Sequence, residues 1–261
     1  MSDEFHRWLL RGRLLVSRLL RRPLLLRVPL LEGDAELAIT STRELRRATG
    51  FALEVDFAHR VQQRLQTGDT VFDVGANIGV VTLALATTQT GRSCTFHSFE
   101  PEPRNHRQLT GNLTLNGLDG RASGHALALG DRDGEVELFV RGATGAGRHS
   151  IASSDKATGA ISVPITTLTS FAAAHGAAPD VLKVDVEGAE GYVLAGMDGL
   201  HPDRFPREIF LEIHPGGLGD RMPDGGTIDA WLSSRGYREV WRQERRSEVH
   251  CHYTRSGDGE A

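Results

Sequence analysis

The sequence predicts an α/β fold of the doubly wound, Rossmann-like type, in which helices cover both faces of a mostly parallel sheet. Three observations predict it. Short apolar runs with the length of buried strands alternate with helical segments along the chain. A glycine turn at residues 75–79 joins one such strand to an apolar helix. Near the end, residues 237–241 and 248–253 alternate apolar and polar side chains around a charged turn, which predicts a hairpin at an antiparallel edge.

The first 31 residues form a basic amphipathic segment that differs from the rest of the chain, residues 32–261. Seven arginines against two acidic residues give it a net charge of +5, which leaves −9 for the remainder. At helical spacing its apolar side chains gather opposite the arginines, over a predicted helix that ends at Gly33. Such a helix can lie on an anionic membrane surface, or pack its leucines on the domain or on a partner protomer. Arginines interrupt every apolar run, so the segment is neither a transmembrane span nor a signal peptide.

Strands and helices then alternate through the remaining chain. A helix is expected over residues 50–66, and Gly68-Asp69 turns the chain into the first strand, residues 71–74. The later strands are apolar runs bounded by turns, expected over residues 95–100, 121–127, 135–140, 161–165, 181–185 and 208–213. The later helices are expected over residues 104–115, 168–174 and 189–197. Residues 142–160 are rich in Gly, Ala and Ser and predict a loop over the sheet edge.

Composition favours a single soluble domain. A chain of 261 residues can bury one sizeable core, and 39% apolar with 25% charged residues is ordinary for a globular protein. The net charge of −4 argues against a nucleic-acid partner, because proteins that bind nucleic acids are usually basic. Cys94 and Cys251 provide no disulfide framework, which favours a reducing compartment. We therefore expect a cytoplasmic protein, with a peripheral membrane location as the alternative if residues 1–31 bind lipid.

The strongest candidate binding site is the segment from Val71 to Gly79. Asp73 lies at the end of a buried strand, and Gly75 and Gly79 then form a tight turn. Glycine accepts a positive φ and lets a ligand approach the backbone closely. A carboxylate beside such a turn and a helix N-terminus suits a ligand with cationic and anionic groups, such as the amino-acid end of S-adenosylmethionine. NAD fits less well, because its G-x-G-x-x-G motif would need glycines at positions 77 and 80. The alternative is a structural turn with Asp73 on the surface.

Glu100 supplies a second marker for a nucleoside. It ends the strand 95–100, lies 21 residues after Gly79 and precedes Pro101. In doubly wound domains, an acidic residue about 20 residues beyond the glycine turn binds the ribose hydroxyls. Glu100 alone could equally cap the helix over residues 104–115. Together with the glycine turn, the nucleoside interpretation is preferred.

Five polar residues at strand ends form a candidate catalytic site, and they are Lys183, Asp185, Glu187, Glu212 and His214. Side chains two positions apart in a strand share a side, and ligands of open α/β sheets lie beyond the carboxyl ends of the strands. One pocket could therefore hold all five. A carboxylate, a histidine or a desolvated lysine could serve as the general base for an alcohol acceptor. Alternatively, Lys183 forms a buried ion pair with Asp185 or Glu212 that only stabilises the strand ends.

A metal ion is the other possibility for the same residues. Asp185, Glu187, Glu212 and His214 could hold a divalent cation that acidifies a hydroxyl. We disfavour it, because the positive charge of Lys183 would compete with a cation, and no metal ligand is assigned. The His250-Cys251-His252 segment alternates between the two faces of its strand without a matching ligand cluster, so zinc is not expected there.

Four of these segments together resemble the FkbM-type methyltransferases: Asp73-Val-Gly-Ala-Asn-Ile-Gly79, Phe99-Glu-Pro101, Ala128-Leu-Gly-Asp131 and Lys183-Val-Asp-Val-Glu-Gly-Ala-Glu190. The resemblance spans roughly residues 50–215. It implies a class I, Rossmann-like, S-adenosylmethionine-dependent O-methyltransferase with a seven-stranded sheet, acting on a hydroxyl of a saccharide or polyketide-like secondary metabolite. By motif match, the cofactor would be bound by Asp73, Gly75, Asn77, Gly79 and Glu100.

The chain departs from the pattern of this family in two places, and two other functions remain as alternatives. Thr167-Leu168-Thr169 stands where the family usually has Thr-Leu-Asp, and the arginine-rich N-terminus lies outside the resemblance. A NAD- or nucleotide-sugar-dependent enzyme on a similar sheet is disfavoured by the glycine spacing. A non-catalytic, cofactor-binding scaffold of a biosynthetic assembly is disfavoured by the intact Lys183, Asp185 and Glu187. The identity of the small-molecule or glycan acceptor and the oligomeric state are not determined by the sequence.

Overall fold

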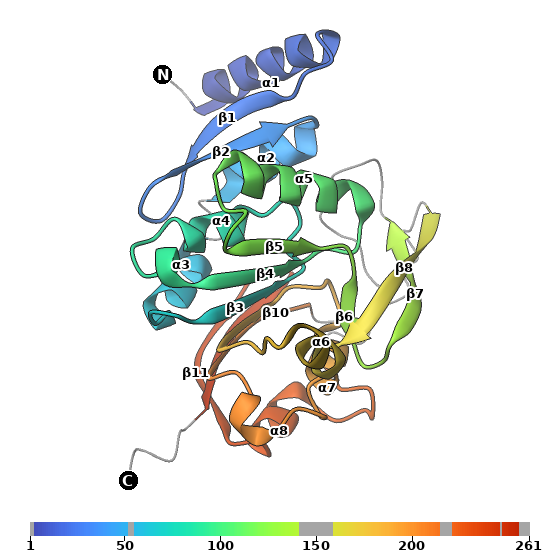
Figure 1. The fold of residues 1–261 in the computed structure, drawn as a ribbon. Helices are drawn as coiled ribbons and strands as arrows, with labels where there is room; N and C mark the ends of the chain where they lie inside the picture. The colour runs from blue at the N-terminus through green and yellow to red at the C-terminus, as the bar shows by residue number, and fades with distance from the viewer. Residues whose placement is uncertain (1–2, 52–54, 141–158, 215–220, 246, 256–261) are drawn as a thin grey trace.

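The computed structural model describes residues 3–51, 55–140, 159–214, 221–245 and 247–255, and a seven-stranded sheet forms its centre (Figure 1). The strand order is β11-β12-β10-β9-β3-β4-β5. These strands are β3 (Thr70–Val74), β4 (Thr95–Phe99), β5 (Ala122–His125), β9 (Val181–Val184), β10 (Glu208–Ile213), β11 (Tyr237–Glu244) and β12 (Val249–Arg255). β12 is antiparallel to both of its neighbours, and the other neighbouring pairs are parallel. The predicted doubly wound sheet with an antiparallel edge hairpin is confirmed.

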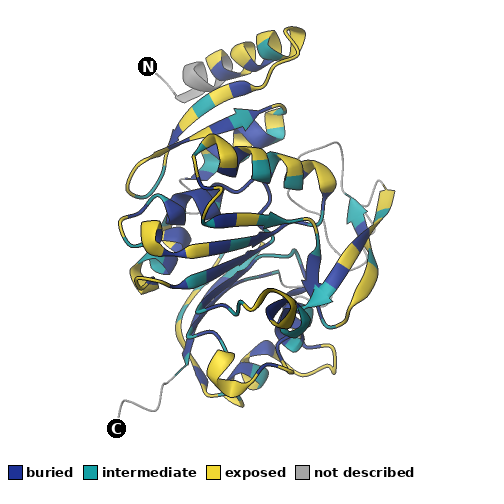
Figure 2. Ribbon diagram, in the orientation of Figure 1, coloured by how far each residue is buried: buried dark blue, intermediate teal, exposed yellow. Residues whose placement is uncertain are grey.

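Helices cover both faces of this sheet (Figure 1). One face packs against α3 (Val55–Arg64), α4 (Val80–Ala86) and α5 (Pro103–Leu115), and the other against α6 (Leu168–His175), α7 (Glu190–Ala195) and α8 (Ile228–Ser233). Alternation along the strands divides the core in two. In β3, Val71 belongs to the first core, whereas Phe72 and Val74 belong to the second. Both cores appear as buried strands between the helical layers in Figure 2.

Several element bounds differ from the expected ones. The helix expected over residues 50–66 is α3, and it is preceded by a separate helix α2 (Thr42–Gly50), with residues 52–54 outside the described part. The strands β6 (Ala128–Gly130), β7 (Gly134–Val140) and β8 (Gly159–Thr167) form their own three-stranded sheet in the order β6-β8-β7. Most of the expected loop, residues 142–158, lies outside the described residues. The described residues also include the short 3₁₀ helices η2 (Gly91–Ser93) and η3 (Pro202–Arg204).

The N-terminal segment is not one helix up to Gly33, and that expectation is wrong. Helix α1 (Asp3–Leu19) is followed by a hairpin of β1 (Leu24–Pro29) and β2 (Asp34–Ile39), paired along all six residues of each strand. The helix stops because Arg21 has a φ of 52° and Pro23 cannot donate a backbone hydrogen bond. No helix in the described part of the chain combines the length and apolar character that crossing a bilayer requires.

Amide side chains of α5 attach this hairpin to the domain. Asn112 accepts a hydrogen bond from the backbone N–H of Ala38 at 3.0 Å, and donates one to the carbonyl of Ile78 at 2.8 Å. Asn116 accepts from the N–H of Glu36 at 2.9 Å and donates to its carbonyl at 2.8 Å. Residues four apart on a helix advance about 6 Å, close to the two-residue repeat of a strand. The two asparagines therefore match the open edge of β2.

We expect Asn112→Leu to lower the free energy of unfolding by roughly 1–3 kcal/mol, because it leaves the Ala38 N–H and the Ile78 carbonyl without a partner. Urea denaturation of the purified protein measures this change. Asn116→Leu is the matched control, since Asn116 is only half-buried and water can replace its amide. Equal losses in both variants would contradict a special role for Asn112.

Candidate functional site

A cavity lies beyond the carboxyl ends of β3, β4 and β9. It encloses about 590 Å³, part of which is open to solvent, a size typical of small-molecule sites. Its polar wall includes Gly75, Asn77, Glu100, Asp185 and Glu187. Its apolar wall is formed mainly by Val74, Phe99, Pro101, Leu127, Leu129 and Leu138. Five of the sequence-predicted site residues thus share one space, as expected for a sheet of this topology.

The glycine turn has the backbone conformation that the sequence predicts. Gly75, Asn77 and Gly79 have φ values of 80°, 51° and 88°. A Cβ atom on Gly75 would lie 1.8 Å from the backbone oxygen of Asp185, so no other residue fits there. Gly79 serves packing instead, because its Cβ would lie 2.7 Å from a methyl group of Leu109. The turn is therefore held tightly between neighbouring elements.

Glu100 is a buried carboxylate on the cavity wall. Its two oxygens accept the backbone N–H groups of Asn77 and Glu102, each at 2.9 Å. Burial raises the pKa of Glu100 to about 7, although these hydrogen bonds oppose the shift. The capping alternative is wrong, since the side chain that caps α5 belongs to Glu102. Each carboxylate oxygen keeps acceptor capacity, which suits the hydroxyls of a ribose.

Asp73 is placed differently from the expected ligand contact. It is 1% exposed and does not line the cavity. One of its oxygens lies 3.0 Å from Nζ of Lys183, and the other accepts a hydrogen bond from Thr82 at 2.7 Å. Asp73 and Lys183 are direct partners in the register of β3 and β9. The expected partner of Lys183 was Asp185 or Glu212, but the closest carboxylate is that of Asp73.

Lys183 is a poor candidate for a general base. Burial lowers its pKa, but the carboxylates of Asp73, Asp185 and Glu212 outweigh burial and hold the pKa above its ordinary value. Nζ lies 3.8 Å from Oδ2 of Asp185, farther than from Asp73. The side chain of Lys183 therefore stays protonated and acts as a buried cation next to Asp73 and Asp185.

A second cavity of about 440 Å³ adjoins the first. The two share Gly75, Asn77 and Asp185 in their walls, together with Arg47 of α2. The second cavity is also lined by Phe57, Ile78, Val80, Val81, Lys183 and Glu212. Asp185 therefore lies at the junction of two spaces, one with the expected cofactor residues and one with two of the expected catalytic residues.

His214 is held among carboxylates. Its Nδ1 lies 3.0 Å from Glu190, and its Nε2 lies 3.5 Å from Glu187 and 3.6 Å from Glu212. Burial lowers the pKa of His214, but the hydrogen bond to Glu190 and the charges of Glu187 and Asp185 outweigh it and raise the pKa to about 9. The ring is thus an imidazolium at neutral pH, which leaves the carboxylates as the groups able to accept a proton.

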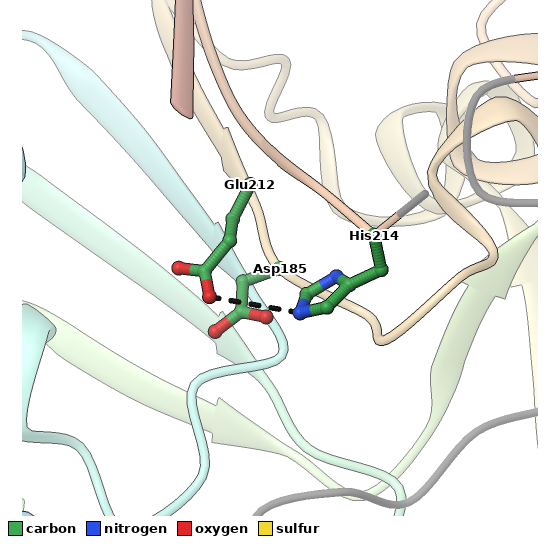
Figure 3. A group of neighbouring side chains, drawn as sticks. All are labelled: Asp185, Glu212 and His214. Carbon is green, nitrogen blue, oxygen red and sulfur yellow. Dashed lines mark ion pairs between the residues drawn. The ribbon is translucent and has the colours of Figure 1, made fainter. Parts of the chain in front are cut away.

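Figure 3 shows Asp185, Glu212 and His214 pointing toward one another from the ends of β9 and β10. Their nearest ligand atoms lie within 4.8 Å of one another. A second such group joins Glu212 to Glu248 and His250, with Nε2 of His250 3.3 Å from Oε2 of Glu212. The expectation that His250 lacks neighbouring ligands is therefore wrong, because strand pairing places Glu212 opposite it.

Sequence reasoning missed four residues of this region, namely Arg47, Phe57, Glu190 and His250. Glu190 belongs to the Lys-x-Asp-x-Glu-Gly-Ala-Glu pattern of the resemblance, so a signal was present in the sequence. Arg47 and Phe57 come from helices before the first motif, and His250 comes from the final strand. Their proximity to the site depends on tertiary packing alone.

Comparison with known proteins places the chain in a family. Residues 73–239 match the sequence profile of the family described as Methyltransferase FkbM domain. The 31-O-demethyl-FK506 methyltransferase FkbM of Streptomyces tacrolimicus is 29% identical over 211 residues, covering 69% of this chain and 76% of that protein. The hexuronic acid methyltransferase AglP of Haloferax volcanii is 26% identical over 190 residues, covering 70% of this chain and 71% of that protein.

A solved structure shares the fold. The crystal structure of Methyltransferase FkbM from Methylobacillus flagellatus superposes with a TM-score of 0.52 at 16% identity, over 84% of this chain and 56% of that one. The family match begins at Asp73 and extends beyond His214, so it spans the glycine turn, Glu100 and the carboxylate cluster. The chain belongs to the FkbM methyltransferase family and is a methyltransferase.

Proposed function

We propose that the protein is an S-adenosylmethionine-dependent O-methyltransferase that acts on a hydroxyl of a saccharide or polyketide-like acceptor. The observation that carries this proposal is the pair of joined cavities that meet at Asp185. One cavity has the features of a nucleoside site, and the other has carboxylates suited to a hydroxyl. The names of two relatives support the acceptor class, since one acts on a 31-O-demethyl compound and the other on a hexuronic acid.

The first cavity fits S-adenosylmethionine by its donor and acceptor groups. Glu100 has acceptor capacity for two ribose hydroxyls, and Phe99 and Leu129 offer apolar surface to a base. The backbone at Gly75 is open to close approach because no side chain fits at that position. When bound, the cofactor supplies the methyl group, and the protein's residues bind and orient it. Asp73 supports this wall indirectly, through its ion pair with Lys183.

Proton removal from the acceptor is assigned to Asp185. As the acceptor oxygen bonds to the methyl carbon, the carbon–sulfur bond breaks and the hydroxyl proton must leave. Lys183 and His214 both carry protons already, whereas Asp185 is a partly exposed carboxylate at the junction of the cavities. Glu212 lines the acceptor side and is placed to orient the hydroxyl.

Affinity for S-adenosylhomocysteine, the stable product, should rise with pH between 6 and 8. The ribose hydroxyls donate to the ionised form of Glu100, whose pKa is about 7 in the free protein. One pH unit below the pKa only about a tenth of the carboxyl is ionised, so the affinity at pH 6 should be roughly tenfold lower than at pH 8. Calorimetry at both values measures this. Glu100→Gln should bind more weakly at pH 8 and lose the dependence; a flat wild-type profile would contradict the ribose assignment.

Asp185→Asn should lower turnover by about 100-fold or more, the usual scale for a lost general base. Affinity for S-adenosylhomocysteine should change little. Turnover is measured as product release with an acceptor found by screening saccharides and polyketide-like alcohols. Glu137→Gln removes the same charge from an exposed position on β7 and should leave both quantities unchanged. Near-wild-type turnover in Asp185→Asn would remove Asp185 from the reaction.

We also propose that α1 rests on an anionic membrane. Leu10 and Leu14 face the domain at 3% and 1% exposure, whereas Leu15, Val16, Leu19 and Leu20 are 54–76% exposed. Apolar side chains exposed to this extent on one helix mark an interaction surface. Arg11 and Arg13 are exposed on the same helix, and their charges complement acidic lipid headgroups.

Vesicle sedimentation tests this surface. The protein should sediment with phosphatidylglycerol vesicles more than with phosphatidylcholine vesicles, and less at high salt. Leu15→Ser combined with Leu19→Ser should reduce binding at least tenfold, whereas Leu115→Ser on α5, also exposed, should not. If the double variant instead dissociates a dimer in light scattering while vesicle binding is absent throughout, α1 contacts a second copy and the membrane proposal fails.

A further inference from the structure

Two of the side chains in Figure 3, Glu212 and His214, are separated by a distance that suits a shared ion better than direct contact. Nε2 of His214 and Oε1 of Glu212 are 3.6 Å apart, too far for a good hydrogen bond. Two ligands bound at about 2.1 Å to one ion lie roughly 3.0–3.6 Å from each other. The nearest ligand atoms of Asp185, Glu212 and His214 all lie within 4.8 Å of one another.

Fully buried partners hold two of these side chains from behind. Glu190, which is 0% exposed, is hydrogen bonded to Nδ1 of His214 at 3.0 Å and so directs Nε2 toward the carboxylates. His250, also 0% exposed, has no hydrogen-bond partner on either ring nitrogen among the described residues, and its Nε2 lies 3.3 Å from Oε2 of Glu212. A carboxylate behind a histidine is a usual support of a metal ligand. The ring of His250, unpartnered among the described residues, lies close enough to Glu212 to support that carboxylate in the same way.

The charge of Lys183 does not oppose a cation as strongly as the sequence suggests. Its ammonium group is 3.0 Å from Asp73 and 3.8 Å from Asp185, so Asp73 takes up most of its charge. Nε2 of His214 lies 3.5 Å from Glu187 and 3.6 Å from Glu212. In the wall of the second cavity, Asp185 and Glu212 therefore lie beside a lysine whose charge is paired mainly with Asp73.

We propose that Asp185, Glu212 and His214 bind a divalent transition-metal ion such as Mn²⁺ or Zn²⁺. An imidazole nitrogen with two carboxylate oxygens suits these ions better than Ca²⁺, which takes oxygen ligands. Only the role of the ion rests on the proposed function: Asp185 and Glu212 line the acceptor cavity, where an ion lowers the pKa of a bound hydroxyl. The ion takes the place of the Nε2 proton of His214, which is released to solvent on binding. Binding of the ion itself requires neither cofactor nor acceptor.

Titration of the chelator-treated full-length protein with Mn²⁺ alone tests the site, with free Mn²⁺ followed by electron paramagnetic resonance. We expect one ion per chain. Glu212→Gln and His214→Gln should each weaken binding at least tenfold, and Glu190→Gln about tenfold through the orientation of His214. Glu137→Gln, which removes one exposed negative charge on β7, should not weaken it. Circular dichroism of each variant without metal confirms that it is folded.

Two results would overturn the site. One is the absence of saturable binding of one Mn²⁺ per chain. The other is loss of binding in Glu248→Gln but not in His214→Gln, which would move the ion to the neighbouring group of Glu212, Glu248 and His250. Calorimetry with S-adenosylhomocysteine on the same samples keeps the two proposals separate. Cofactor-product binding without Mn²⁺ binding refutes only the metal site, and the reverse result refutes only the proposed function.

Discussion

The ion pair between Asp73 and Lys183 is the interaction on which the walls of both cavities depend. Both side chains are almost completely buried, and a lone charge in such a position costs several kcal/mol, so each requires the other. The pair joins β3 to β9 in direct register. Two residues further along each strand, Gly75 meets the backbone oxygen of Asp185 at a distance that excludes any side chain. The Asp73–Gly79 motif and the Lys183–Glu190 motif therefore contact each other directly.

Positively and negatively charged side chains alternate across the site. Lys183 lies between Asp73 and Asp185, and His214 lies between Glu190 and Glu212. The folded-state pKa of His214, about 9, is above its ordinary value, so its protonation stabilises the fold. That contribution is complete below about pH 6.5 and is lost as the pH rises through about 9. Lys183 and His214 thus both stay positively charged over the neutral range.

The parts that the sequence predicts well are those encoded in neighbouring residues. Short apolar runs and turn glycines locate the central strands, and the spacing from Gly79 to Glu100 singles out a carboxylate that lies in the cavity wall. The N-terminal hairpin was missed because leucine and arginine are strong helix formers, and only pairing with β2 makes residues 24–29 a strand. The partners of Lys183 and His250 were missed for a similar reason. Both contacts cross between strands, and a single sequence does not show which strands are neighbours.

The attachment of the hairpin to α5 has a consequence for synthesis of the chain. Ala38 and its partner Asn112 are 74 residues apart. At ribosomal rates of about 5–20 residues per second, roughly 4–15 s pass between their synthesis. Through that interval β2 presents an open strand edge, the kind of surface that pairs with other chains. Asp34 is paired with Arg27 within the hairpin, which leaves the exposed Glu36 as the acidic side chain of this strand that would repel a second copy during that interval.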